Sequence, residues 1–176
     1  ISRLSEEKGI AYLIKTVAIL AERGNNVKAV VIGEGHQKEM LQKLIISNNL
    51  FDRILLAGYR SNAFNYLSLF DVFVLPSLTE GLPIVILEAM QAGVPIIATN
   101  VGGVPDVLGK GSYGIIVETG NPELLADACS RLFSDADFAE RMARDAKNAV
   151  LSEYTSRRMA KKYLNVYEAV LHKWKQ

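Results

Sequence analysis

Residues 72–99 constrain the possible fold more than any other stretch of this 176-residue chain. They begin with a short apolar run, Val72 to Leu75, and end with a second apolar run over 94–99. Apolar runs of this length between turn signals indicate buried strands. Between the runs, Pro83 suits the first turn of a helix, and Gly93 can end that helix in a left-handed conformation. The stretch therefore predicts a strand, a loop, a short helix and a second strand.

The predicted helix over 83–92 is apolar almost all round, and Glu88 and Gln91 are its polar residues. A helix that is apolar on every side is normally buried. Carboxylates are almost never fully buried unless they are paired. We therefore expect Glu88 to have a partner, and Glu80 at the helix mouth is a second carboxylate for which a partner is expected.

The start of this helix is also a candidate anion site. Free N–H groups and the helix dipole both favour negative charge there. Gly81 lets a ligand approach the backbone closely. The sequence thus predicts a pocket that takes an anion and offers two carboxylates, Glu80 and Glu88, to hydroxyl groups, which is what a sugar nucleotide requires.

Strand and helix patterns alternate along the rest of the chain, which predicts one α/β domain with a doubly wound parallel sheet (Rossmann-like) covered on both faces. In such sheets ligands bind at the carboxyl ends of the strands, and the candidate residues follow predicted strands. The expected strands are the end of one at Ile1 to Leu4, then 27–32, 53–57, 72–75, 94–99 and 114–117.

Composition excludes several classes of protein. A net charge of +1 argues against a dedicated nucleic-acid binder. One cysteine, Cys129, cannot form an intramolecular disulfide. No apolar run approaches the roughly 18 residues that a membrane span needs. The chain opens without Met and inside a motif, so we expect it to be an excised fragment.

The stretch Glu80-Gly-Leu-Pro-Ile-Val-Ile-Leu-Glu88 resembles the E-x7-E motif of retaining glycosyltransferases of the GT-B fold. The segment Arg3-Leu-Ser-Glu-Glu-Lys8-Gly9 is similar to the Gly-Arg-Leu-x-x-x-Lys-Gly segment of the same enzymes, with Ser2 where glycine is usual. The nearest resemblance is to the group 1 family, often called family 4, and it covers essentially the whole chain. It implies the single C-terminal, donor-binding domain of a GT-B enzyme.

The resemblance implies catalytic roles for Arg3, Lys8 and Glu80. Arg3 and Lys8 would grip the donor diphosphate, whereas the alternative for these two cations is a solvated surface. Glu80 would lie beside the transferred sugar and Glu88 would bind the ribose hydroxyls. The structural alternative is that Glu80 caps the helix and Glu88 pairs with a base at the core edge.

The remaining predicted substrate-binding residues follow from the same resemblance. The backbone N–H groups of Gly81 and Leu82 would meet sugar or phosphate, and the side chains of Ile84 and Val85 would pack near the ribose. The 33–35 turn and the loop with Tyr59 and Arg60 would approach the nucleotide. Tight turns are the structural alternative for the glycines of the 33–35 turn. These residues are Gly81, Leu82, Ile84, Val85, Gly33, Gly35, Tyr59 and Arg60. The Gly102-Gly103 loop would permit a close approach of backbones.

No metal or other cofactor is expected, and the resemblance implies a nucleotide-diphosphate sugar as the substrate. Asp135 and Asp137 look like a DxD metal motif, but they lie at a predicted helix start, where acidic residues favour the dipole. His36 and His172 have no ligand partners at metal spacing. No GxGxxG follows a strand and opens a helix, which argues against a dinucleotide-dependent dehydrogenase.

Residues 155–176 predict a final amphipathic helix with an apolar stripe that includes Met159, Tyr163 and Trp174. Its other face carries six Lys or Arg residues and Glu168, a net charge of +5. By the resemblance, this helix docks on the absent N-terminal acceptor domain. A basic amphipathic helix can also lie on an anionic membrane, so peripheral membrane association is the alternative.

The expected function of the full enzyme is transfer of a hexose from a nucleotide-diphosphate sugar to a growing polysaccharide or a lipid-linked glycan, with retention of configuration. Lipopolysaccharide synthesis is one such setting, and the fragment alone is expected to be inactive. The alternatives are a non-catalytic membrane- or partner-binding module and a GT-B-like sugar-nucleotide epimerase. A cytoplasmic location is expected, with the cytoplasmic face of the membrane as the alternative.

Overall fold

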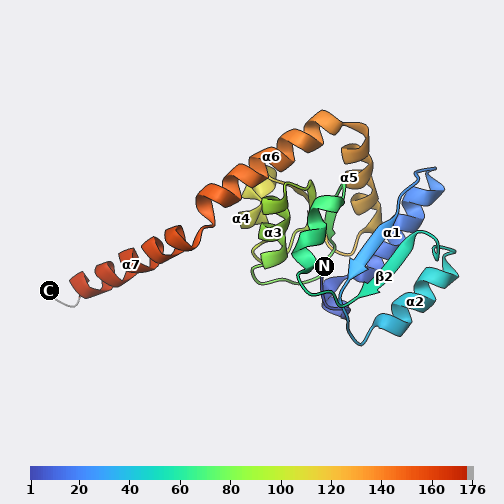
Figure 1. Ribbon diagram of the computed structural model, residues 1–176, viewed down its shortest axis with the longest axis horizontal. Coiled ribbons are helices and arrows are strands. Elements are labelled where there is room, and N and C mark those ends of the chain that lie inside the picture. Colours follow the sequence, from blue (N-terminus) through green and yellow to red (C-terminus); the bar gives the residue numbers. More distant parts are fainter. Residues whose placement is uncertain (174–176) are drawn as a thin grey trace.

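The computed structural model describes residues 1–173, and Figure 1 shows an α/β body from which the last helix projects. All strand pairs are parallel, as predicted. The strands are β1 (Ala29–Ile32), β2 (Ile54–Gly58), β3 (Phe73–Leu75), β4 (Ile96–Thr99) and β5 (Ile115–Val117). The α-helices are α1 (Ile10–Glu22), α2 (Lys38–Ser47), α3 (Ile84–Ala92), α4 (Val104–Val107), α5 (Pro122–Ser134), α6 (Ala136–Glu153) and α7 (Ser156–Lys173). Three 3₁₀ segments, η1 (Glu6–Lys8), η2 (Ala63–Leu69) and η3 (Gly109–Gly111), connect them.

The strands form two separate sheets, one with the order β1–β2 and one with the order β3–β4–β5. In the second sheet, Phe73 lies opposite Ile96 and Ile97 opposite Ile115. The predicted strand at Ile1 to Leu4 is an extended segment outside both sheets. Ser2 and Leu4 nevertheless donate backbone hydrogen bonds to the carbonyl groups of Ile32 and Glu34 at the end of β1.

Strand β4 is buried on both faces, which explains why it reads as a continuous apolar run. Ile96 and Ala98 pack into a core formed with α3, α4 and α6, whereas Ile97 packs on the opposite face with α5. The β1–β2 sheet has its own core beneath α1 and α2, in which Ile14 is fully buried. The helices therefore cover both faces of the sheet that carries the predicted site.

Local signals set the helix ends. Gly93 ends α3 in the left-handed conformation, as predicted. The Asn121 side chain caps α5 by accepting hydrogen bonds from the N–H groups of Glu123 and Leu124. The Asp135 carboxylate caps α6 by accepting one from the N–H of Phe138, so this acidic residue has the structural role expected of it.

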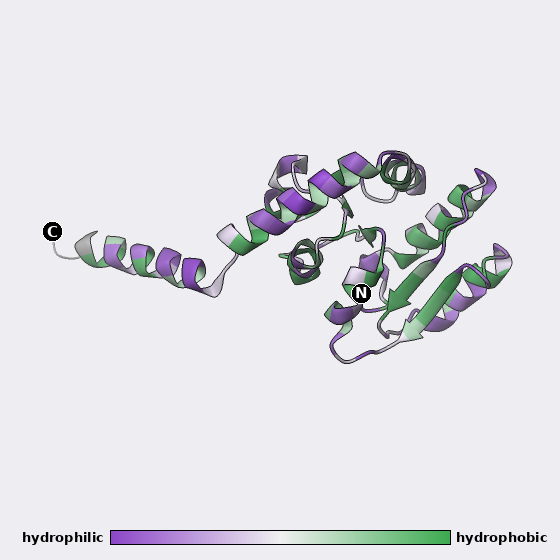
Figure 2. Cartoon of the chain, turned by 45° about the horizontal axis from the view of Figure 1, so that its top comes forward, coloured by the Kyte–Doolittle hydropathy of each residue, from purple (hydrophilic) through white to green (hydrophobic). Residues whose placement is uncertain are grey.

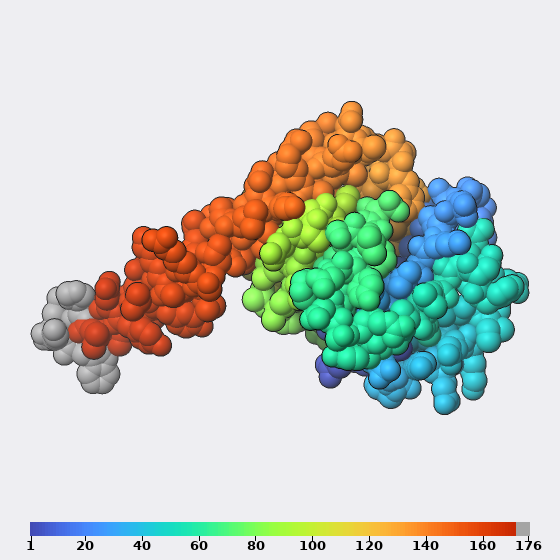
Figure 3. Space-filling model, viewed as in Figure 1, coloured from blue at the N-terminus to red at the C-terminus, as the bar shows by residue number. Residues whose placement is uncertain are grey.

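Helix α7 leaves the body as a projecting arm (Figures 1 and 3). Thr155 caps it, because its hydroxyl group accepts a hydrogen bond from the N–H of Arg158. Residues from Ser156 to Leu171 are all exposed, and green apolar and purple polar positions alternate around the helix in Figure 2. Trp174 and Lys175 of the predicted stripe and charged face lie outside the described residues. No helix among residues 1–173 is both long and apolar enough to cross a membrane.

Candidate donor-binding site

Two loops that are far apart in the sequence meet at the carboxyl end of β3. The first holds η1 and the second runs from Pro76 to Pro83, between β3 and α3. Leu78 donates a backbone hydrogen bond of 2.8 Å to the carbonyl group of Glu7. Gly9 has a φ of 63°, and a Cβ there would overlap the carbonyl oxygen of Pro76. Glycine at position 9 therefore lets the two loops lie against each other.

The contact between these loops centres on the Glu80 carboxylate. Lys8 Nζ lies 2.8 Å from Glu80 Oε1, and the Ser77 hydroxyl group donates a hydrogen bond of 2.7 Å to the same oxygen. The Glu80 side chain is 8% exposed and that of Lys8 is 19% exposed. Pairing offsets much of the cost of burying either charge. The expectation that Glu80 needs a partner is thus met by Lys8, itself a predicted site residue.

Sequence reasoning missed Ser77 and Thr99, which hold this cluster in place. Both residues are fully buried. Thr99 is at the end of β4, and its hydroxyl group donates to the backbone carbonyl of Ser77. The available signal was the position of these hydroxyl residues at or just beyond the carboxyl ends of two buried strands.

The Gly102-Gly103 loop packs under the loop that carries Glu80. Gly103 donates a backbone hydrogen bond of 2.8 Å to the carbonyl group of Gly81. Gly102 has a φ of 51°, and a Cβ there would overlap the Glu80 carbonyl oxygen. The predicted close approach of backbones is therefore present, and it fixes the position of the Glu80–Gly81 segment against the Gly102-Gly103 loop.

The first turn of α3 is open to solvent. A Cβ added at Gly81 would meet no heavy atom of the described chain within 4 Å, and Leu82 and Ile84 are 60% and 66% exposed. The expectation of a helix buried all round is wrong here, because the site opens over the start of the helix. Ile86, Ala89 and Met90 are buried farther along, as expected. The free N–H groups of the first turn thus remain accessible to an anion.

Glu88 differs from Glu80 in lacking a partner. It lies half-buried on α3, next to the half-buried Leu87. Within residues 1–173, its carboxylate takes part in no hydrogen bond or salt bridge, so the pairing expected from the sequence is not found. The predicted alternative in which a base at the core edge neutralises Glu88 is therefore not supported. A carboxylate without a protein partner is free to accept hydrogen bonds from ligand hydroxyl groups.

Arg3 lies apart from the Lys8–Glu80 pair. Its side chain is 78% exposed, and its guanidinium group is 3.5 Å from Glu7 Oε1. The Ser5 hydroxyl donates to this same oxygen, and this hydrogen bond is the main cause that lowers the pKa of Glu7. Arg3 is therefore an exposed cation that contacts Glu7, five positions before Lys8 in the same segment.

The 33–35 turn follows β1 and the 58–60 loop follows β2, so both lie at the carboxyl ends of their strands. Gly33 bonds to the carbonyl group of Gly58, which joins the two loops. A Cβ at Gly35 would overlap the carbonyl oxygen of Leu4, so packing against Leu4 is enough to require glycine at this position. Tyr59 and Arg60 are exposed, and the Arg60 guanidinium group donates to the Tyr59 carbonyl.

The remaining candidate chemistry is structural. Cys129 is buried, and burial raises the pKa of its thiol to about 12. His36 is exposed, whereas the His172 side chain lies outside the described residues. Among the residues that the structure describes, no group of three or more His, Cys, Asp or Glu side chains lies close enough to share a metal ion.

The family model for glycosyl transferases group 1 matches residues 1–149. The chain belongs to this family. Alpha-D-kanosaminyltransferase of Streptomyces kanamyceticus is 34% identical over 172 residues, which are 97% of this chain and 45% of that protein. The 2-deoxystreptamine N-acetyl-D-glucosaminyltransferase of Niallia circulans is 30% identical over 177 residues, with 98% of this chain and 46% of that protein covered. This group 1 chain spans about half the length of the curated relatives that it matches.

Solved structures confirm the predicted fold class. HepE from Anabaena, determined in complex with UDP, superposes with a TM-score of 0.88 at 22% identity, covering 96% of this chain and 47% of that one. The C-terminal domain of the group 1 protein LpcC from Francisella tularensis has a TM-score of 0.80 at 24% identity, covering 89% and 84%. The fold of this group 1 domain is therefore the one that the resemblance implied.

Proposed function

We propose that this group 1 domain binds a nucleotide-diphosphate sugar, and that the full protein transfers its hexose to an acceptor with retention at the anomeric carbon. The observation that carries the proposal is the Lys8–Glu80 pair beside the open first turn of α3. Lys8 is paired with Glu80, and Glu80 directly precedes Gly81, where an added Cβ would meet no described heavy atom within 4 Å.

The proposed chemistry is electrostatic. Negative charge grows on the diphosphate as the bond to the sugar breaks, and fixed positive charge stabilises it. Lys8, the N–H groups at the start of α3 and the exposed Arg3 would supply that charge. Because these groups belong to the protein itself, we propose that the reaction is independent of metal.

Each carboxylate has a different proposed role. Among residues 1–173, Glu88 has no hydrogen-bond or salt-bridge partner, and it would accept hydrogen bonds from the ribose hydroxyl groups. Glu80 is held by Lys8 and Ser77 and would lie beside the transferred sugar. The backbone of Gly81 and Leu82, the side chains of Ile84 and Val85, and the loops with Gly33, Gly35, Tyr59 and Arg60 would complete the donor site. Assignment to family 4 and retention rest on the E-x7-E spacing of Glu80 and Glu88.

The proposed acceptor is a growing polysaccharide or a lipid-linked glycan. The proposed location is cytoplasmic, with the cytoplasmic face of the membrane as the alternative. We propose that α7 docks on the acceptor domain of the same polypeptide. Supporting this, Met159, Tyr163 and Val166 on α7 are exposed yet line an apolar groove with Leu82 and Leu87. Salt-sensitive sedimentation of the full protein with anionic liposomes would instead favour the membrane as the partner of α7.

The test is a transfer assay with the full-length protein and UDP-, GDP- and ADP-hexoses, read by proton NMR of the product. The proposal expects an α-linked product from an α-linked donor, with activity retained in EDTA. A product with inverted configuration would contradict retention. Conversion of the donor sugar without an acceptor would favour the epimerase instead.

A further inference from the structure

Within residues 1–173, the Glu80 carboxylate is bonded through only one of its two oxygen atoms. Lys8 Nζ lies 2.8 Å from Oε1, and the Ser77 hydroxyl group donates to the same Oε1 at 2.7 Å. In this part of the chain, no buried side-chain nitrogen or oxygen atom lacks a hydrogen-bond partner. The unbonded Oε2 must therefore reach solvent, where it is a free acceptor for a ligand.

Ser77 limits how far the Glu80 carboxylate can turn. Ser77 is fully buried, and its hydroxyl group has one hydrogen to donate, which it gives to Glu80 Oε1. Lys8 reaches the same oxygen with a long, flexible side chain, whereas Ser77 reaches it from a short one. Ser77 is therefore the stiffer of the two contacts, and it determines which oxygen of Glu80 stays free.

The position of Ser77 depends in turn on Thr99, the last residue of β4. The Thr99 hydroxyl group donates to the Ser77 carbonyl, and the Leu75 carbonyl lies 3.3 Å from the same hydroxyl. Strand β4 is the middle strand of its sheet, and Thr99 is paired there with Val117 of β5. Thr99 thus ties the loop that follows β3 to the centre of the sheet. The hydrogen bonds from Thr99 to Ser77 and from Ser77 to Glu80 form what we call the hydroxyl chain.

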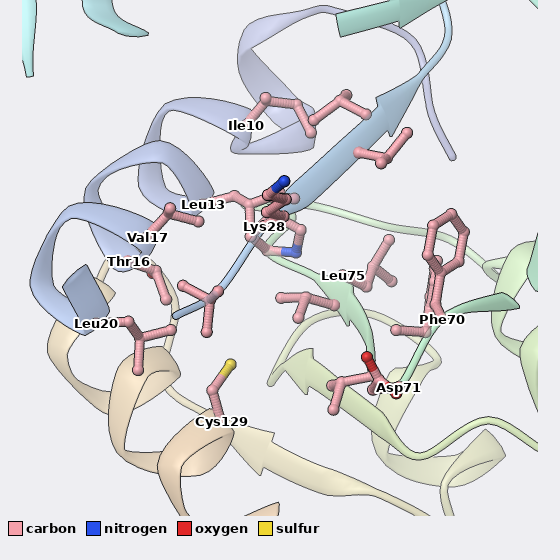
Figure 4. A pocket seen from close by; sticks show the side chains of 18 of the residues that line it. Ile10, Leu13, Thr16, Val17, Leu20, Lys28, Phe70, Asp71, Leu75 and Cys129 are labelled. Atoms are coloured by element: carbon pink, nitrogen blue, oxygen red, sulfur yellow. The ribbon is translucent and has the colours of Figure 1, made fainter. Parts of the chain in front are cut away.

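Thr16 shows what a buried threonine does when its role is structural alone. Like Thr99, it is fully buried, and its hydroxyl group donates to two backbone carbonyls, those of Tyr12 and Pro122. In Figure 4, Thr16 lies on α1, across a cavity from Leu75 of β3. Its partners belong to α1 and α5 and not to the loops of the candidate site. Thr16 is therefore a matched control for Thr99.

We propose that Ser77 and Thr99 are positioning residues for the transfer reaction. The hydroxyl chain holds Glu80 so that Oε2 accepts a hydrogen bond from a hydroxyl group of the transferred sugar. This inference rests on the proposed function, because it takes the donor sugar to lie beside Glu80. Neither Ser77 nor Thr99 contacts the donor itself, and both act through the carboxylate.

The hydroxyl chain should affect the sugar and not the nucleotide. The diphosphate and the ribose are assigned to Lys8, Arg3 and Glu88, none of which is bonded to Ser77 or Thr99. A carboxylate that is free to turn loses its alignment with the sugar, and a small misalignment of a reacting group costs much of its rate. Loss of the hydroxyl chain should therefore lower turnover of the donor while nucleotide affinity is kept.

The test uses the full-length protein and two measurements. Calorimetry with UDP, GDP and ADP gives nucleotide affinity, and release of nucleotide from the saturating glucose or mannose conjugate gives kcat. Ser77→Ala and Thr99→Val should each lower kcat by about tenfold or more, and change the nucleotide Kd by less than about twofold. Thr16→Val should leave both quantities within about twofold of those of the unsubstituted protein.

A conservative variant separates the hydroxyl group from the shape of the side chain. Thr99→Ser keeps the hydroxyl and loses the methyl group, whereas Thr99→Val keeps the shape and loses the hydroxyl. Thr99→Ser should therefore retain kcat within about threefold, well above the kcat of Thr99→Val.

Three outcomes overturn the proposal. If Ser77→Ala and Thr99→Val keep the kcat of the unsubstituted protein, the hydroxyl chain has no positioning role, while the proposed function stands. If Thr99→Ser loses as much kcat as Thr99→Val, packing by the methyl group is responsible. If the unsubstituted full-length protein binds none of the nucleotides and releases none from their conjugates, the proposed function fails, and this inference fails with it.

Discussion

Lys8 Nζ and Glu80 Oε1 lie 2.8 Å apart although 72 positions separate the two residues in the sequence. The pair joins the loop after the first extended segment to the loop before α3. It therefore links the proposed diphosphate-binding cation to the carboxylate beside the proposed sugar position. We expect both the stability of the domain and the shape of the proposed donor site to depend on this contact.

Lys8→Met should lower the free energy of unfolding by about 2–3 kcal/mol, because it leaves the Glu80 carboxylate largely buried without its cation. Adding Glu80→Gln should restore at least half of the loss, since the neutral amide can still accept from the Ser77 hydroxyl. Urea unfolding of both variants measures this. Lys38→Met on exposed α2 is the control, and equal losses for Lys8→Met and Lys38→Met would refute the coupling.

Gly102→Ala should lower stability and weaken donor binding together, because the new Cβ overlaps the backbone of Glu80. Gly120→Ala is a matched control: its φ is 69°, but its Cβ would meet side-chain atoms of Tyr12 no closer than 3.7 Å. Both variants bear the left-handed strain of about 1 kcal/mol. Thermal unfolding and nucleotide titration should show an excess loss for Gly102→Ala, and equal effects would speak against the packing role.

Glu88→Gln should change the free energy of unfolding by less than about 0.5 kcal/mol, because the carboxylate has no partner among the described residues. The same variant should weaken nucleotide binding by about tenfold, through the loss of charged hydrogen bonds to the ribose. Glu22→Gln, on the exposed end of α1, is the control. A large loss of stability in Glu88→Gln would instead favour a structural role.

The sequence predicted the strand, loop, helix and strand of residues 72–99 because Pro83 and Gly93 are local signals for the start and the end of the helix. It could not predict that Lys8 pairs with Glu80, since hydropathy patterns carry no information about contacts 72 residues apart. The exposure of Ile84 was missed for a related reason. An apolar residue at a helix start is expected to be buried unless the positions of the neighbouring loops are known. The division into two sheets was missed because apolar runs identify strands but not which edges are paired.

The most direct test of the donor-site account is calorimetric titration of the domain with UDP, GDP and ADP. The account predicts that one of these nucleotides binds, and that Lys8→Gln weakens its binding by about tenfold or more while Lys38→Gln leaves it unchanged. Binding to Lys8→Gln and to Glu88→Gln that is as strong as binding to the unsubstituted domain would contradict the account. So would a failure of all three nucleotides to bind both this domain and the full-length protein.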